Sequence, residues 1–198
     1  MKTVFVFAMQ DERVDVTESI QEVVHEGDFY YLKTGIGKVN AASSLTKFLE
    51  QYDVDCIMNI GLAGSVSDHD VMDVVLIKEA LFHDVDATLF GYPTYQVPGM
   101  PVSYKSDESL LDICKKGIFQ SVDTLYTGDQ FITKKMPFEG VVDMEGAALY
   151  QVAYLYSKPI VSIKVISDVI GKQSYQAFHM KKGSQLIAKI VKQLKEVL

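Results

Sequence analysis

Arginine is almost absent from this 198-residue chain, in which Arg13 is the only one. Because arginine is the side chain best shaped to clamp a phosphate through paired hydrogen bonds, a site built on several arginines is excluded. The formal net charge of −7 also argues against nucleic-acid backbones and anionic membrane surfaces as partners. The composition therefore does not favour a protein that binds polyanions.

Cysteine and histidine are scarce as well. Cys56 and Cys114 are the only cysteines, and both stand among apolar residues, so we expect buried free thiols rather than a disulfide. His25, His69 and His179 lack the spacing of metal ligands. We therefore expect no metal and no other cofactor.

Long hydrophobic runs are also missing, since no stretch is apolar enough to span a membrane. The chain begins directly with a strand-like pattern at residues 3–8, without the architecture of a signal peptide. We therefore expect a cytoplasmic protein with no membrane partner.

Strand-like and helix-like segments alternate along the chain, as they do in proteins whose helices cover a mostly parallel sheet. The expected strands are 3–8, 29–33, 54–60, 72–82, 124–126, 140–143 and 159–166, and the expected helices are 37–52, 107–116, 145–156 and a C-terminal segment whose apolar stripe covers 186–198. The pattern predicts one domain over residues 1–198, a three-layer α/β/α sandwich with a mostly parallel, mixed central sheet.

Carboxylates stand just beyond three of the expected strands. Glu12, Glu145 and Asp168 occupy these positions, and Asp143 lies two residues before Glu145. Ligands of α/β sheets bind at the strand ends, so these acids predict a pocket for a polyhydroxylated, positively polarised substrate. Each acid also has a structural interpretation: Glu12 as the first acid of a short exposed helix, Glu145 as a first-turn acid favoured by the helix dipole, and Asp168 as the N-cap of the following turn.

Two glycine pairs also follow expected strands. The segment 35–38 (GIGK) lacks the spacing of a P-loop and the third glycine of a dinucleotide fingerprint, so a tight turn is favoured there. In the segment 61–64 (GLAG), the small residues allow a ligand to approach the backbone closely.

The order of the short motifs resembles that of the 5′-methylthioadenosine/S-adenosylhomocysteine nucleosidases, within the purine nucleoside phosphorylase superfamily. The motifs are residues 8–12 (AMQDE), 35–39 (GIGKV), 59–64 (NIGLAG), 82–88 (FHDVDAT) with 90–92 (FGY), 128–132 (GDQFI), 143–147 (DMEGA) and 167–168 (SD). The resemblance extends almost from end to end, and it implies a nucleoside phosphorylase-like fold.

The resemblance implies hydrolysis of the N-glycosidic bond of 5′-modified adenine nucleosides, with release of adenine. Asp168 corresponds to the general acid that protonates the purine near N7, which requires a raised carboxyl pKa. Glu12 corresponds to the residue that activates the attacking water. Glu145 corresponds to the acid that holds the ribose hydroxyls and favours the ribosyl cation.

The family also implies a set of substrate-binding residues. Met144 is expected against the ribose, Phe131 on the base, the backbone of Ile132 at the edge of the base, and Phe178 beside base and ribose. The remaining expected binding residues are Ile36, Ala63, Gly64, Asp143 and Ser167.

The long loop rich in aromatic residues and proline has a separate expected role. In the family, the loop that carries Phe90, Tyr92 and Pro98 borders the 5′-substituent pocket of the neighbouring subunit. The resemblance therefore implies a homodimer. His83 and Asp84, just before this loop, are expected to be structural rather than catalytic.

Two alternative functions remain open: a purine nucleoside phosphorylase and a nucleoside-binding protein without activity. A carboxylate at Glu12 would repel phosphate, and Arg13 is the only arginine available, so hydrolysis is favoured. A pure binder has no need of a water-activating base. The 5′-group that is preferred stays open, and the expected setting is methionine salvage.

The chain also departs from the family. Asp143 stands where Glu is common and has a shorter side chain with which to reach a ribose hydroxyl, and Leu62 stands where many members have Ser. The connection between residues 13 and 29 is too brief for the usual pair of strands. The connection 133–140 leaves little room for the usual helix, and both losses are expected to open the pocket.

Overall fold

The structure is a computed structural model that describes residues 1–9, 23–117, 121–171 and 177–198, without the side chains of 177–180. In these ranges the strands are β1 (Thr3–Phe7), β2 (Val23–Glu26), β3 (Phe29–Lys33), β4 (Cys56–Ser65), β5 (Val74–Phe82), β6 (Tyr104–Lys105), β7 (Ser121–Thr127), β8 (Val141–Asp143) and β9 (Ile160–Val169). The α-helices are α1 (Lys38–Gln51), α2 (Glu108–Cys114), α3 (Gly146–Leu155) and α4 (Ala177–Val197), and a 3₁₀ turn, η2, covers Thr88–Phe90.

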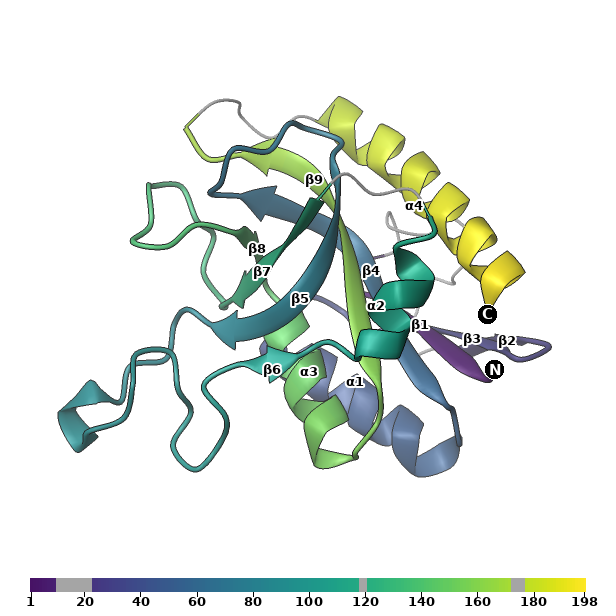
Figure 1. Cartoon of the computed structure of the whole chain (residues 1–198), viewed down its shortest axis with the longest axis horizontal. Helices are drawn as coiled ribbons and strands as arrows, with labels where there is room; N and C mark the ends of the chain where they lie inside the picture. The colour runs from purple at the N-terminus through teal and green to yellow at the C-terminus, as the bar shows by residue number, and fades with distance from the viewer. Residues whose placement is uncertain (10–22, 118–120, 172–176) are drawn as a thin grey trace.

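All of these strands belong to one mixed sheet (Figure 1). One half has the order β2-β3-β1-β4, with β1 parallel to both β3 and β4 and with β2 antiparallel at the edge. In the other half the pairing β4-β9-β5-β7-β8 returns to β4, so that five strands close into a ring. The mixed, mostly parallel sheet confirms the predicted fold class.

Irregular pairing in the long strands accompanies the closure of this ring. The register of β4 against β9 shifts between Ala63 and Gly64, and that of β5 against β7 shifts between Ile77 and Glu79. Such shifts bend a strand and increase its twist. Beyond its shift, β4 pairs with β8 through Gly64 and Ser65.

Two hydrophobic cores lie on the two faces of the sheet. Val4 and Val6 of β1 pack in the core that includes α1 and α3, whereas Phe5 and Phe7 pack in the core that includes α2 and α4. Successive side chains of a strand point to opposite faces, so β1 is buried on both sides. Figure 1 shows α4 across the sheet from α1 and α3, which gives the three layers.

The expected elements are found with shifted ends; for example, the segment predicted as 54–60 continues to Ser65. The sequence predicted no strand between residues 8 and 29, and this prediction was wrong. Val23–Glu26 forms β2, which pairs with β3 across a turn in which Gly27 has φ +61°. The glycine of this turn was the feature of the sequence that could have predicted the hairpin of β2 and β3. No helix is present in the described segment 133–140, in line with the sequence.

Cys56 and Cys114 are buried free thiols, as expected. Burial raises the pKa of Cys114 to about 12. Of the helices in the described parts of the chain, none has the length and apolar character needed to cross a bilayer.

Candidate active site

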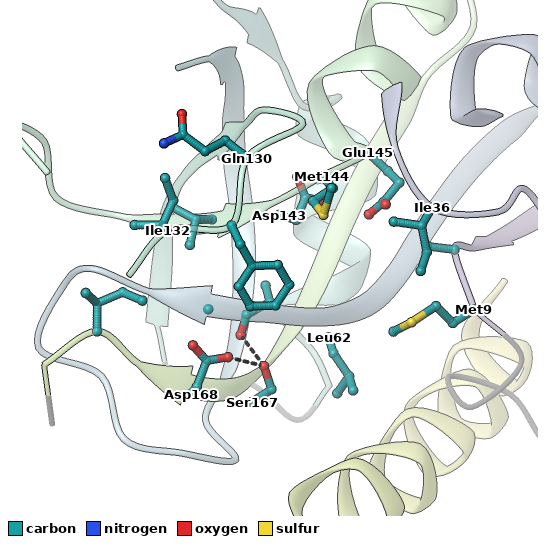
Figure 2. A pocket seen from close by; sticks show the side chains of 16 residues that line it. Met9, Ile36, Leu62, Gln130, Ile132, Asp143, Met144, Glu145, Ser167 and Asp168 are labelled. Atoms are coloured by element: carbon teal, nitrogen blue, oxygen red, sulfur yellow. Dashed lines mark hydrogen bonds between the residues drawn. The ribbon is translucent and has the colours of Figure 1, made fainter. Parts of the chain in front are cut away.

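A cavity of about 200 Å³ opens beyond the carboxyl ends of β1, β4 and β9. Ten of the residues expected at the site line it: Ile36, Ala63, Gly64, Phe131, Ile132, Asp143, Met144, Glu145, Ser167 and Asp168. They come from segments that are far apart in the sequence and that the sheet brings together. Figure 2 shows the carboxylates of Glu145 and Asp168 entering the cavity from different sides.

Glu145 lies at the junction of β8 and α3, immediately before the first residue of the helix. Its residue surface is only 7% exposed, and the backbone N–H of Gly37 donates a hydrogen bond of 2.8 Å to its Oε1. The amide thus stabilises a charged carboxylate that faces the cavity. A buried anion in this position is suited to interact with hydroxyl groups and with positive charge.

Asp168 lies near the end of β9, and its neighbour Ser167 orients it. The Ser167 hydroxyl is 2.7 Å from Oδ1 of Asp168 and 3.2 Å from the carbonyl oxygen of Ala63 (Figure 2). A Cβ atom at Gly64 would be 3.3 Å from Oδ2 of Asp168. The glycine therefore leaves room for the carboxylate at the cavity wall.

Asp143 also borders the cavity, but its carboxylate has several protein partners. Oδ2 lies 2.8 Å from Nζ of Lys164, and these two side chains are 2% and 3% exposed. Thr127 donates its hydroxyl to Oδ1 over 2.6 Å, and the N–H of Gly146 lies 3.0 and 3.1 Å from the two oxygens. Asp143 therefore connects β7, β8, β9 and α3, and a ribose hydroxyl would have to compete with these contacts.

Several expected residues are not placed in this cavity. Phe90, Tyr92 and Pro98 lie in the connection between β5 and β6, which projects from the body of the molecule (Figure 1). Phe90 is 77% exposed. Glu12 lies outside the described residues, as does the side chain of Phe178.

The sequence argument missed some residues that the structure places at the site. Met9 and Gln130 line the cavity beside the expected residues, and so does Leu62, which the sequence had indicated only as a departure from the family. Lys164, in the centre of β9, forms an ion pair with Asp143. A lysine within such an apolar strand was the feature of the sequence that could have indicated a buried acidic partner. Among the described residues, no group of three or more His, Cys, Asp or Glu side chains is arranged to hold a metal ion.

Comparisons with known proteins identify the family of the chain. The chain matches the Phosphorylase superfamily over residues 15–196. A 5′-methylthioadenosine/S-adenosylhomocysteine nucleosidase from Geobacillus sp. (strain WCH70) is 34% identical, and the alignment covers 99% of this chain and 100% of that protein. This alignment has 232 positions, so the relative contains segments that the 198-residue chain lacks. A nucleosidase of the same name from Oceanobacillus iheyensis is 37% identical, covering 86% of this chain and 84% of the relative.

Solved structures lead to the same family. The nucleosidase from Neisseria meningitidis in complex with methylthio-immucillin-A has a TM-score of 0.86 and 28% identity, with 100% of each chain covered. The nucleosidase from Colwellia psychrerythraea in complex with adenine has a TM-score of 0.83 and 27% identity, covering 100% of this chain and 96% of the other. The chain therefore belongs to the 5′-methylthioadenosine/S-adenosylhomocysteine nucleosidase family of the Phosphorylase superfamily.

Proposed function

We propose that this protein hydrolyses the N-glycosidic bond of 5′-methylthioadenosine and S-adenosylhomocysteine and releases adenine. One observation carries the proposal: Glu145 and Asp168, which come from different elements, face the same cavity in a chain that aligns along its length with these nucleosidases. The solved relatives that bind adenine and methylthio-immucillin-A support a nucleoside-type ligand for this cavity.

In the proposed reaction, the oxygen of water bonds to C1′ of the ribose while the bond from C1′ to N9 of adenine breaks. Protonated Asp168 donates its proton to N7, so that the base leaves as neutral adenine. Ser167 donates to Oδ1 of Asp168, which leaves the other oxygen as the one to carry this proton. Glu12 accepts a proton from the water, although its position lies outside the described residues.

Glu145 has an electrostatic role in this scheme. Positive charge develops on the ribose ring as the base departs, and a carboxylate in a partly enclosed cavity stabilises that charge more strongly than one in water. The hydrogen bond from Gly37 holds the carboxylate in place before the substrate arrives.

The lining of the cavity supports water rather than phosphate as the second reactant. Of the described residues that line it, none is Lys or Arg, whereas three are the acids Asp143, Glu145 and Asp168. A phosphate dianion needs cationic or multiple N–H donors. The phosphorylase alternative is therefore disfavoured.

The proposal also covers the oligomeric state, the location in the cell and the metabolic pathway. The connection between β5 and β6 exposes Leu89 (90%) and Phe90 (77%), and such apolar exposure supports a role in a homodimer that borders the partner's cavity. A cytoplasmic location and a part in methionine salvage complete the proposal, as expected for the family.

The test is an assay of adenine formation from methylthioadenosine in phosphate-free buffer, with Glu12→Gln and Asp168→Asn alongside. We expect the wild type to release adenine and both variants to lose most of their turnover, while Glu12→Gln still binds substrate. Turnover that requires phosphate and yields a sugar 1-phosphate would support a phosphorylase instead. Binding without turnover in the wild type would support a non-catalytic protein.

A further inference from the structure

A second group of charged residues lies beside the cavity, and the proposed reaction makes no use of it. Lys38, Asp84 and Asp129 form this group, which we call the Lys38 cluster. The ammonium of Lys38 lies 2.5 Å from Oδ2 of Asp84, and the backbone N–H of Asp129 donates to the same oxygen over 3.0 Å. The backbone N–H of Lys38 donates to Oδ1 of Asp129 over 2.9 Å. The three residues therefore hold each other through both main-chain and side-chain contacts.

Each member of the cluster is next to a part of the cavity wall. Lys38 follows Ile36, which lines the cavity, and Gly37, which donates to Glu145. Asp129 directly precedes Gln130, Phe131 and Ile132, which line the cavity from another side. The Lys38 cluster thus joins the start of α1 to the segment after β7, although 91 residues separate Lys38 from Asp129.

The part of the segment after β7 that borders the cavity has no regular secondary structure, whereas further along Phe138 stacks on Tyr126 with ring centroids 3.9 Å apart. Residues 131–139 contain no helix or strand in the described structure, and Phe131 is 71% exposed. A Cβ atom at Gly37 would lie 3.1 Å from Oδ1 of Asp129, so the two walls meet closely at this point. The contacts of the cluster are therefore well placed to set the position of Phe131.

The charges of the cluster are partly covered but remain accessible to ions. The side chains of Lys38, Asp84 and Asp129 are 24%, 21% and 44% exposed. Burial raises the pKa of Asp84, but the contacts with Lys38 and with the amide of Asp129 outweigh this and leave the pKa below its usual value. The carboxylate is thus charged near neutral pH, and its attraction to Lys38 weakens as salt is added.

We propose that Lys38 is a positioning residue for the purine base, because it holds residues 129–132 against the start of α1 before the substrate arrives. A preformed wall binds its ligand more tightly than one that must be ordered on binding, because the cost of ordering has already been met in folding. Loss of the cluster therefore weakens binding of the base. It has less effect on the chemical step, because Asp168 and Glu145 are carried by other elements. This inference rests on the proposed function.

The test compares Lys38→Met, which removes the charge, with Lys38→Arg, which keeps it. Lys115→Met is the matched control, because Lys115 pairs with Asp112 on α2, across the sheet from α1 and α3. The measurements are kcat and KM for methylthioadenosine and the Kd for adenine, at low and at high sodium chloride concentration. Thermal unfolding of each variant checks that it is folded.

At low salt, we expect Lys38→Met to raise KM and the adenine Kd about fivefold, with kcat within about twofold of the wild type. High salt should raise the wild-type values toward those of Lys38→Met, because the ions screen the pair. Lys38→Arg should restore most of the affinity, and Lys115→Met should match the wild type. A role limited to stability would not produce this dependence on salt.

Two results would overturn the inference alone, with the wild type still releasing adenine: unchanged affinity in Lys38→Met and in a second variant, Asp84→Asn, or a loss of affinity that does not change with salt. If the folded wild type neither bound nor released adenine, the proposed function would fail, and this inference would fail with it.

Discussion

The backbone N–H of Gly37 donates a 2.8 Å hydrogen bond to the carboxylate of Glu145, although 108 residues separate the two in the sequence. Gly37 precedes α1 with φ +93° and ψ 158°, a conformation that is essentially restricted to glycine. The turn after β3 thus has a role at the site as well as in the fold, because it presents an N–H group to a buried acid.

The first prediction concerns this glycine. Gly37→Ala should reduce the free energy of unfolding by about 1–3 kcal/mol, because alanine is strained in this conformation. The new Cβ would also lie 3.1 Å from Oδ1 of Asp129, so kcat for adenine release should fall as Glu145 loses its position. Gly27→Ala is the control: its φ is +61° and its Cβ would meet nothing within 4 Å. This control should lose about 1 kcal/mol and keep wild-type activity. Equal kcat values in the two variants would contradict the role of Gly37.

The second prediction separates the charge of Glu145 from its shape. Glu145→Gln keeps an oxygen that accepts from Gly37 but removes the negative charge, so kcat should fall about 100-fold while the protein remains folded. Steady-state kinetics with methylthioadenosine, together with the urea midpoint, measures both effects. A variant with near wild-type kcat would show that the charge at this position does not act on the ribose.

The third prediction concerns the buried pair of Asp143 and Lys164. Lys164→Met leaves the Asp143 carboxylate buried without its ammonium partner, so the free energy of unfolding should fall by about 3–5 kcal/mol. The double variant with Asp143→Asn should recover part of this loss, because the uncompensated charge is gone. Urea unfolding measures both.

A surface pair provides the comparison for this measurement. Lys105 pairs with Glu79, and its side chain is 70% exposed. Lys105→Met should change the free energy of unfolding by less than about 1 kcal/mol. A cost for Lys164→Met as small as this would mean that the buried pair does not hold the junction of β8 and α3 together.

The fourth prediction concerns alkaline pH. Burial raises the pKa of the Cys114 thiol from 9.0 to about 12 and that of Tyr150 from 10.0 to about 12. Above pH 9 the unfolded chain therefore loses protons that the folded protein keeps, so the free energy of unfolding should fall steadily as the pH rises toward 12. Chemical unfolding at a series of pH values measures this slope, and Tyr150→Phe should make it shallower. Stability that stays constant or increases between neutral pH and pH 11 would contradict the account.

Most strands of the sheet could be predicted from the sequence, but the closing of five of them into a ring could not. Strands such as β1 and β9 could be predicted because their side chains are buried on both faces and form short apolar runs. The closed ring depends on which strands pair, and the shifts at Ala63–Gly64 and Ile77–Glu79 leave no clear pattern in the sequence. The strand β2 was missed because Val23 and Val24 are its only apolar residues.

The site residues that could be predicted from the sequence are those that lie at or just beyond the end of a strand. Glu145 and Asp168 could be recognised by position, and both face the cavity. The partners of Asp143 could not be recognised, because Thr127 and Lys164 come from strands that only the folded sheet brings together. The Lys38 cluster was hidden for the same reason, since Lys38 begins α1 whereas Asp84 and Asp129 follow β5 and β7.

The central claim is that Asp168 and Glu145 serve a single adenine nucleoside in one cavity. A crystal structure of the protein with adenine tests it most directly. We expect the base to lie against Phe131, with N7 within hydrogen-bonding distance of Asp168 and with the cavity beside Glu145 left open for the ribose. Adenine bound elsewhere, for example in the second cavity between α2 and α4, with the cavity at Asp168 empty, would contradict the account.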